Sequence, residues 1–490
     1  MANNTAEKSI NQLNISTMKR KYLLLLMLSS IALASVAQQP PLSRIEINNV
    51  NATILGNGSC FSPQKYVEYV EPKPCPTWSV PAGTTKETIY QHALWFGGLD
   101  SSDSLHLAAL RYGQYSGSPA GDYGSGPLKT ADASIDLYNA MKYHHIWNLT
   151  RAEIEQFIAN HNTAGYQIPD DILTWPAHGD AGYAENLAPF VDVNHDGRYN
   201  PADGDYPDIK GDQCLFFIFN DVFLPHLESN GGALGLEVHA MVYAFNAPND
   251  EALNNTVFVN YKFFNRSAND YHNTYIGLWT DWDLGYARDD YVGCDVQRNS
   301  CFAYNGMEID GSGEWEAYGD NPPVQVLTVL NGPDGLGMTG FMYHNNTTSV
   351  TGDPRDASEY YMLLQSRWFD GSHLQYGGGG FPGWDGTVGP DCNYMFPGDT
   401  DPDNIGTGGV APNGGYNTNG KYWTEEESGN SPEDRRGLAS VGPFAFPAGG
   451  VKELDYAFIT VWKNSSMSAF ERKGEFIDHI KSLFNNGFAK

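Results

Sequence analysis

Twelve consecutive residues in the first half of the chain carry oxygen-bearing side chains at a spacing that suits calcium. Asp or Asn stands at loop positions 1, 3, 5, 9 and 12, and Gly197 stands at position 6, where the chain must turn sharply. Calcium takes six to eight oxygen ligands, and this spacing folds them around one point. Position 7 would contribute its backbone carbonyl. The predicted ligands are Asp192, Asn194, Asp196, Arg198, Asn200 and Asp203.

This loop resembles those of EF-hands and dockerins but departs from the EF-hand pattern. Position 12 is Asp203, whose side chain is shorter than the usual Glu and reaches less far toward an ion. Pro189 precedes the loop and Pro201 lies near its end, so two flanking helices are not expected. We therefore expect a calcium loop without the EF-hand switch. An Asx-rich turn that binds no metal is the alternative.

Two further groups of acidic residues carry weaker metal signals. The first group follows a predicted strand and could bind calcium at the rim of a sandwich; it comprises Asp281, Asp283, Asp289, Asp290 and Asp295. The second group repeats the 1, 3, 5 spacing but lacks the turn glycine; it comprises Asp399, Asp401 and Asp403. For both groups, charges solvated on loops are the alternative interpretation.

Catalytic motifs do not emerge from the sequence, so we predict no catalytic residues and favour a non-enzymatic protein. The chain has no Gly-x-Ser-x-Gly nucleophile elbow, no His-Glu-x-x-His zinc helix and no phosphate-binding glycine loop. Tryptophans near glycine-rich segments could stack on sugar rings, which suits a carbohydrate-binding or glycoside hydrolase-like alternative. Packing in the core is the competing interpretation of these residues, which are Trp368, Trp384 and Trp423.

The N-terminal segment has the organisation of a secretory signal peptide. From Met18, three basic residues precede an apolar run over residues 22–33 and a small-residue cleavage site at residues 34–37. We interpret residues 18–37 as the signal and residues 1–17 as an extension from a start assigned too early. The apolar run is shorter than the roughly 20 residues of a membrane span. The chain is therefore predicted to be exported, without stable membrane insertion after the signal is removed.

Charge and cysteine content fit an exported protein. The net charge of the whole chain is −29, which disfavours nucleic acid and favours cations. Six cysteines in such a chain suggest disulfides, and the short loops favour Cys60–Cys75 and Cys294–Cys301. Buried free thiols are the alternative.

Strand signals dominate the rest of the chain. Many short apolar or alternating segments are separated by turns rich in Gly, Asn, Asp and Pro, which predicts antiparallel β-sandwich domains with long loops and a few short helices. Residues 360–364 are among the expected strands. Capping boxes predict helices after Thr150 and Ser468. We expect a β-rich module over residues 38–205 that ends in the calcium loop, a β-sandwich region over 206–465 and a C-terminal helix over 466–490.

Several motifs occur together in a recognisable order. They are Ala-Leu-Trp-Phe-Gly-Gly-Leu at 93–99, Trp-Pro-Ala-His-Gly-Asp at 175–180, the segments 188–197, 204–207, 277–285 and 289–295, and Asp-Arg-Arg at 434–436. This set resembles a family of large exported Bacteroidota proteins with no assigned activity, which commonly end in a C-terminal sorting domain for the type IX secretion system. The resemblance implies a secreted or surface-attached protein. No sorting domain is evident after Val461.

Together these features predict a calcium-binding structural or adhesive protein that is extracellular or on the outer cell surface, with the periplasm as the alternative location. Its partner would be a glycan or a cell-surface protein. The alternative function is carbohydrate binding or hydrolysis.

Overall fold

The computed structural model describes residues 40–61, 78–112, 121–383, 387–412 and 422–488. The predicted start extension and signal peptide lie outside these ranges, as do Cys75 and Trp384. Among the described residues, no helix is both long enough and apolar enough to cross a membrane.

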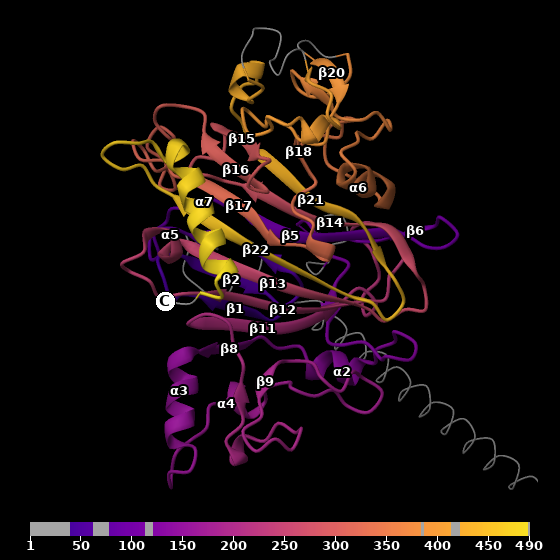
Figure 1. The fold of residues 1–490 in the computed structure, drawn as a ribbon, viewed down its shortest axis with the longest axis vertical. Helices are drawn as coiled ribbons and strands as arrows, with labels where there is room; N and C mark the ends of the chain where they lie inside the picture. The colour runs from indigo at the N-terminus through magenta and orange to yellow at the C-terminus, as the bar shows by residue number, and fades with distance from the viewer. Residues whose placement is uncertain (1–39, 62–77, 113–120, 384–386, 413–421, 489–490) are drawn as a thin grey trace, which may run out of the picture.

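Two antiparallel sheets, each of nine strands in the described ranges, form the body of the protein (Figure 1). The first sheet consists of β1 (Leu42–Ile45), β2 (Asn51–Leu55), β3 (Ser59–Cys60), β5 (Gln91–Leu99), β14 (Tyr271–Trp282), β21 (Arg435–Phe446) and β18 (Gly340–His344) in this order, with β4 (Trp78–Ser79) on β2 and β6 (Leu105–Ala108) on β5. The second consists of β15 (Asp290–Asp295), β16 (Ser300–Asn305), β17 (Val324–Asn331), β22 (Val451–Val461), β13 (Thr256–Asn265), β12 (Leu236–Ala244), β11 (Gln213–Asn220) and β7 (Gly124–Ser125), with β8 (Trp147–Thr150) on β11.

The two sheets pack face to face and share one aromatic core, which confirms the predicted β-sandwich. Phe96 of the first sheet lies 5.2 Å from Phe263 of the second, measured between ring centroids. The buried His92 joins the sheets through a 2.9 Å hydrogen bond with the Tyr456 hydroxyl. Buried aromatic rings supply large apolar area, and their edge-to-face contacts add stability beyond that area.

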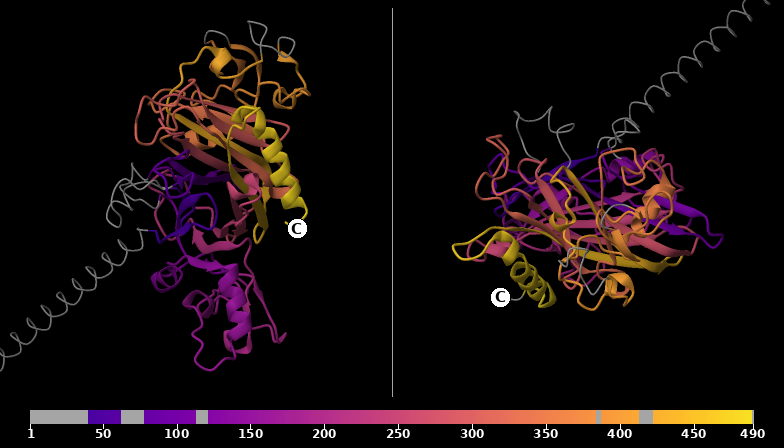
Figure 2. Two further views of the ribbon diagram at one scale, coloured as in Figure 1. Left: turned by 90° about the vertical axis from the view of Figure 1, so that its left-hand side faces the viewer. Right: turned by 90° about the horizontal axis from the view of Figure 1, so that it is seen from above.

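The second sheet is buried on its outer face as well, which explains why its central strands are apolar on both sides. Helix α7 (Ala469–Asn485) crosses β17 and β22 and buries Phe476, Ile477 and Ile480 against them (Figure 1). Figure 2 shows α7 on the side of the sandwich opposite the indigo N-terminal strands. Helix α3 (Arg151–Asn160) buries Ile154 and Phe157 in the same outer cluster.

Both helices predicted from capping boxes begin where expected. The hydroxyls of Thr150 and Ser468 accept the backbone N–H three residues later, and the glutamate at that position reaches back to the cap residue. The other helices and small sheets are short. They are α2 (Leu137–Lys142), α4 (Asp170–Leu173), α5 (Glu251–Asn254), α6 (Ala357–Leu364), the β9 (Phe190–Val191) and β10 (Tyr206–Pro207) pair, and the β19 (Gln375–Gly377) and β20 (Thr387–Asp391) pair.

Two expectations about local and domain structure are corrected. Residues 360–364, expected as a strand, form the end of helix α6, because Asp356 caps the helix by accepting the N–H groups of Ser358 and Glu359. The expected boundary after residue 205 does not separate two cores. Strand β5 pairs with β14, and β8 pairs with β11, so strands from both sides of residue 205 share each sheet.

The predicted disulfides are wrong where the described residues test them. Cys60, Cys214, Cys294, Cys301 and Cys392 are buried free thiols. Cys294 and Cys301 face each other across β15 and β16, but the Cys294 thiol donates a 3.2 Å hydrogen bond to the Met395 carbonyl. Burial raises the pKa of the Cys60 thiol to about 12, which leaves it protonated and unreactive near neutral pH.

Candidate cation sites

Three carboxylates meet at one edge of the first sheet because of how its strands pair. Asp281 and Asp283 lie at the end of β14, and Asp434 lies directly before β21. Because the two strands are antiparallel, with Asp281 opposite Arg436, the end of one meets the start of the other. One oxygen of each carboxylate lies within 4.8 Å of the other two. Among the described residues, this is the only such group of three His, Cys, Asp or Glu side chains, and we call it the acid triad.

Asp281 anchors the acid triad from within the protein. Its side chain is 2% exposed, and its Oδ2 accepts a 2.5 Å hydrogen bond from the Tyr112 hydroxyl. Its Oδ1 accepts no hydrogen bond within the described part of the chain. The nearest cationic atom to Oδ1 is the Arg436 Nε, 3.5 Å away, which is an ion-pair distance rather than a good hydrogen bond. A buried carboxylate oxygen without a hydrogen bond lowers the stability of the folded state unless a further partner reaches it.

Arg436 compensates only part of the negative charge. Its Nη1 donates to Asp434 Oδ1 at 2.9 Å, and its Nε donates to the Tyr112 hydroxyl at 2.9 Å. No hydrogen-bond donor in the described ranges reaches the carboxylate of Asp283. Glu87, which precedes β5, adds a fourth acid at the same edge. Its backbone carbonyl accepts the N–H of Gly285 at 2.8 Å, and this bond holds it near the segment that carries Asp283.

The pKa values reflect this crowding. Burial raises the pKa of Asp281 to about 7, although Arg436 opposes the rise. Burial, with the carboxylates of Asp281 and Glu87, holds the pKa of Asp283 well above its ordinary value. Burial, with Glu316 and then Asp281, raises the pKa of Glu87 to about 8. The edge therefore holds more carboxylates than its one arginine can keep ionised, and a divalent cation is the partner that such a set of hard oxygens prefers.

The other acids of the first predicted group have structural partners. Asp290 Oδ2 accepts the Leu284 N–H at 3.0 Å, and Asp289 Oδ2 accepts the Gly311 N–H at 3.0 Å. Each of these two residues also has a buried Oδ1 without a hydrogen bond in the described ranges. Asp295 pairs with the Arg298 guanidinium at 3.1 Å. These three acids do not join the acid triad.

The loop between β9 and β10 turns sharply at the predicted glycine. Gly197 has a φ of 77°, and its N–H donates to Asp192 Oδ2 at 2.8 Å across the turn. Asn194 Oδ1 accepts the Asp196 N–H at 3.0 Å, and Asp196 Oδ1 accepts the Arg198 N–H at 2.8 Å. These contacts shape an Asx-rich turn, and they leave the side chains on the outside of the protein.

The last part of this loop differs from the expected ligand arrangement. Asp203 is exposed, and its Oδ2 accepts the Asn200 side-chain amide at 2.6 Å. Asp205, which the spacing did not single out, is fully buried and accepts the N–H groups of Val193 at 2.8 Å and of Asn200 at 2.9 Å. Asp205 thus ties the two arms of the loop together through hydrogen bonds to the backbone. The ligand oxygens of Asp192, Asp196 and Asp203 do not all lie within 4.8 Å of one another.

The second weak group also has local roles. Asp401 accepts the N–H groups of Ile405 at 2.7 Å and Gly406 at 2.9 Å, which holds a turn. Asp399 and Asp403 are exposed, and Asp399 shares the lining of a cavity of about 270 Å³ with Asp401.

The tryptophans proposed for sugar stacking lie in the core. Trp368 is 1% exposed and Trp423 is 0% exposed, and their indole N–H groups donate to the carbonyls of Gly380 and Gly378. A sugar ring does not reach these faces, so that prediction is corrected in favour of core packing.

Comparison with known proteins gives no match to any family model and none to a curated protein. The site is therefore interpreted from its own geometry.

Proposed function

We propose that this chain is an exported structural or adhesive β-sandwich protein that a bound calcium ion stabilises at the acid triad. The observation that carries the proposal is the convergence of Asp281, Asp283 and Asp434, with an Asp281 oxygen buried and lacking a hydrogen bond among the described residues. An ion at this point would satisfy that oxygen and offset the repulsion between the three carboxylates.

Calcium suits this site better than a transition metal. The ligands are carboxylates alone, and neither histidine nor cysteine belongs to the group. Oxygen-only sites select calcium, magnesium or manganese, and calcium tolerates the irregular geometry that strand ends provide. Calcium is also the usual structural cation of proteins outside the cell, which agrees with the predicted signal peptide.

The position of the acid triad supports a structural role. It joins the end of β14 to the start of β21, which are neighbouring central strands of the first sheet. A bound ion would therefore tie together segments about 150 residues apart in the sequence and restrain the chain between them. Binding to the folded state alone would stabilise it by mass action.

The Asp192–Asp203 loop is proposed as a second, weaker calcium site. Its chain turns sharply at Gly197, as a calcium loop requires, but Asp203 would have to leave Asn200 to reach an ion. The acid triad and this loop are distinguishable by separate variants, because they lie on different elements.

A calcium titration of the chelator-treated protein tests the proposal. We expect calorimetric binding to the wild type, and loss of the strongest binding event in Asp283→Asn and Asp434→Asn. Asp192→Asn should remove only a weaker event. If Asp283→Asn and Asp434→Asn bind calcium as the wild type does, the acid triad is not the site and the proposal is overturned.

A further inference from the structure

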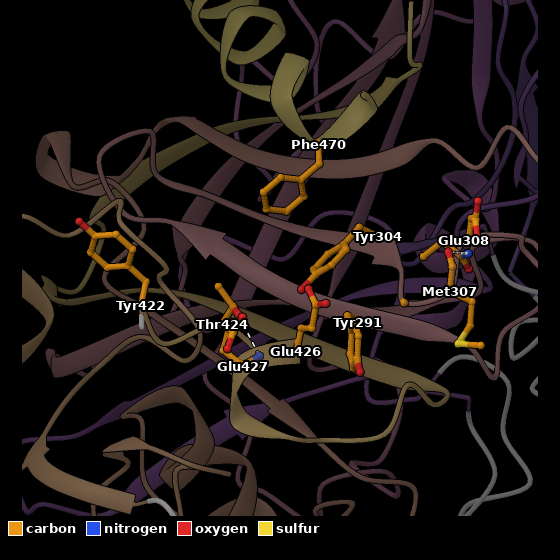
Figure 3. Close-up of a pocket in the computed structure, with 11 residues that line it drawn as sticks. Tyr291, Tyr304, Met307, Glu308, Tyr422, Thr424, Glu426, Glu427 and Phe470 are labelled. Atoms are coloured by element: carbon orange, nitrogen blue, oxygen red, sulfur yellow. Dashed lines mark hydrogen bonds between the residues drawn. The ribbon is translucent and has the colours of Figure 1, made fainter. Parts of the chain in front are cut away.

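Ionisable side chains in the open parts of the structure keep contact with water. Glu308 and Glu426, for example, are exposed where they line a cavity of about 810 Å³ beside β15 and β16 (Figure 3). His226 lies in the opposite environment, because its side chain is only 5% exposed. It belongs to residues 221–235, which connect β11 to β12 and which we call the β11–β12 loop. A buried ionisable group is stable only when its partners match its protonation state.

Both ring nitrogens of His226 contact backbone carbonyl oxygens. Nδ1 lies 2.8 Å from the Leu107 oxygen in β6, and Nε2 lies 2.6 Å from the Asp221 oxygen at the start of the β11–β12 loop. A carbonyl oxygen only accepts hydrogen bonds, so each ring nitrogen has to donate one. A neutral imidazole carries one N–H, whereas an imidazolium carries two. The contacts therefore require the charged form of His226.

Two buried carboxylates supply the opposite charge. Asp122 Oδ2 lies 3.9 Å from Nδ1 of His226, and Asp221 Oδ2 lies 3.8 Å from Nε2. Asp122 comes from the segment before β7, and Asp221 follows β11 directly. Burial lowers the pKa of His226, but the carboxylates of Asp221 and Asp122 and the two carbonyls outweigh it, so this pKa lies above its ordinary value of 6.5.

The other titratable groups packed around the loop have partners of their own. They are Glu228 with the Tyr360 hydroxyl at 3.1 Å and the Arg111 guanidinium at 3.5 Å, Tyr123 with the Ala108 carbonyl at 3.0 Å, His106 with the Asp100 carboxylate at 3.2 Å, and Tyr271 with the Leu234 carbonyl at 2.9 Å. Asp122 and Asp221 are therefore the counter-charges of the His226 ring.

The contacts of His226 hold the β11–β12 loop over the edge of β6. The Leu107 N–H donates to the Gly232 carbonyl at 3.0 Å, and the Leu107 carbonyl accepts the Ser229 hydroxyl at 3.3 Å as well as His226 Nδ1. Uncovered N–H and C=O groups on an edge strand are a template for pairing with another chain. The loop thus protects this part of the β6 edge.

We propose that His226 is a pH-sensitive latch, whose imidazolium holds the β11–β12 loop on the β6 edge and releases the loop when the ring loses a proton. A neutral ring turns a lone pair toward one of the two carbonyl oxygens and leaves two buried carboxylates without their counter-charge, and both changes destabilise the closed loop. This inference does not depend on calcium binding, because His226 and its partners share no residue with the acid triad.

The direction of the response follows from the charge. A histidine whose pKa is raised in the folded state stabilises that state fully below its unfolded pKa, which is about 6.5. This stabilisation is lost as the pH rises through the raised pKa of His226. The latch is therefore closed at acidic and neutral pH and opens toward alkaline pH.

Nitrogen-15 NMR of the histidine rings in the full-length protein tests the charge directly. We expect both ring nitrogens of His226 to carry protons at about pH 7.5 and one of them to lose its proton only at higher pH. His92 is the internal reference for a neutral buried ring, because burial lowers its pKa to about 3. Its nitrogens contact the hydroxyls of Thr280 and Tyr456, which donate as well as accept. A His226 ring with a single proton at about pH 7.5 would overturn the proposal.

Hydrogen exchange of the Leu107 amide tests the release of the loop. After correction for the intrinsic effect of pH on exchange, the wild-type rate should increase at least about tenfold between about pH 7 and pH 10. Amides of the central strand β13 should stay protected, which distinguishes opening of the loop from global unfolding.

One variant separates the charge from the hydrogen bond. His226→Gln keeps a donor but loses the charge, so its Leu107 amide should exchange at least about tenfold faster than that of the wild type at about pH 7, with little further increase at higher pH. His479→Gln is the matched control, because His479 is a half-exposed histidine on α7 and should leave the exchange of Leu107 unchanged. A corrected wild-type rate that does not change with pH, or a His226→Gln variant with the wild-type rate and pH dependence, would refute the latch. If His226→Gln does not fold, the two wild-type titrations still decide.

Discussion

Replacing Asp283 with asparagine should have opposite effects on stability with and without calcium. Asp283 is a member of the acid triad whose carboxylate no hydrogen-bond donor reaches in the described ranges. In chelator, the change removes a charge that repels its neighbours, so the variant should be more stable than the wild type. In calcium, it removes a ligand, so the variant should be less stable than the wild type.

The magnitude follows from the geometry. Two unit charges 4.8 Å apart, the limiting separation in the acid triad, repel by about 3.5 kcal/mol at an effective dielectric constant of about 20. Arg436 offsets much of this repulsion for the pair that it contacts. Asp283 is half-buried, so solvent screens its charge only in part, and the gain in chelator should be about 1–2 kcal/mol. The wild type should gain about 3 kcal/mol at a calcium concentration of roughly 100 times the dissociation constant.

Thermal unfolding of the wild type and the variant, in chelator and in excess calcium, measures both effects. A free-energy change of 1 kcal/mol corresponds to about 1 °C in a chain of this size, so we expect a rise of about 1–2 °C in chelator and loss of a calcium-dependent shift of about 3 °C. Asp320→Asn is the control, because Asp320 is exposed and lies outside the acid triad. A variant that is destabilised in chelator, or that keeps the full calcium shift, would refute the reasoning.

The calcium effect should also depend on pH. Burial raises the pKa of Asp281 to about 7, above its value in the unfolded chain. Between about pH 4 and 7 the ion-free fold therefore binds more protons than the unfolded chain, so its stability falls as the pH rises through this window. Calcium requires the ionised carboxylates and competes with these protons. The calcium-dependent rise in melting temperature should be larger at about pH 8 than at about pH 5, and an equal rise at both would contradict the assignment.

Three further predictions concern other parts of the protein. Asp205→Ala should destabilise the β9–β10 loop and speed its proteolysis, whereas Asp203→Ala should change the rate of proteolysis little. Of these two residues, only Asp205 is buried and bonded to the backbone at both arms of the loop. Equal cleavage of the two variants would be inconsistent with this reasoning. Glu237→Gln should cost about 3–5 kcal/mol in denaturant unfolding, because buried Glu237 forms hydrogen bonds with His239 and Arg266 at 2.7 Å and the change leaves the Arg266 charge unpaired. A cost below 1 kcal/mol would count against this reasoning. Alkylation in denaturant without reductant should label Cys294 and Cys301 fully, as measured by peptide mass. In the native protein the two buried thiols should stay unlabelled. Labelling that requires prior reduction would show that the two cysteines form a disulfide.

The sequence was sufficient to predict features that depend on short-range patterns. Apolar alternation predicted the antiparallel strands, and Ser/Thr–Glu pairs predicted the starts of α3 and α7. The error at residues 360–364 has a local cause: an apolar run of five residues fits a strand or a buried helix, and the Asp356 cap decides between them.

The spacing of residues in the sequence could not predict all three members of the acid triad. Asp281 and Asp283 were predicted as weak ligands, but Asp434 lies about 150 residues later and becomes a neighbour only through the register of β14 and β21. Register is set by the packing of the whole sheet. The same limit explains the boundary predicted after residue 205, because β5 finds its partner β14 across that position.

The proposed binding of a cation at the acid triad can be tested directly by crystallography. We predict that crystals grown in calcium and soaked in manganese show one anomalous difference peak within metal–oxygen bonding distance of Asp281, Asp283 and Asp434. A difference map without such a peak at these three carboxylates, from crystals of the wild type in excess divalent cation, would contradict the account.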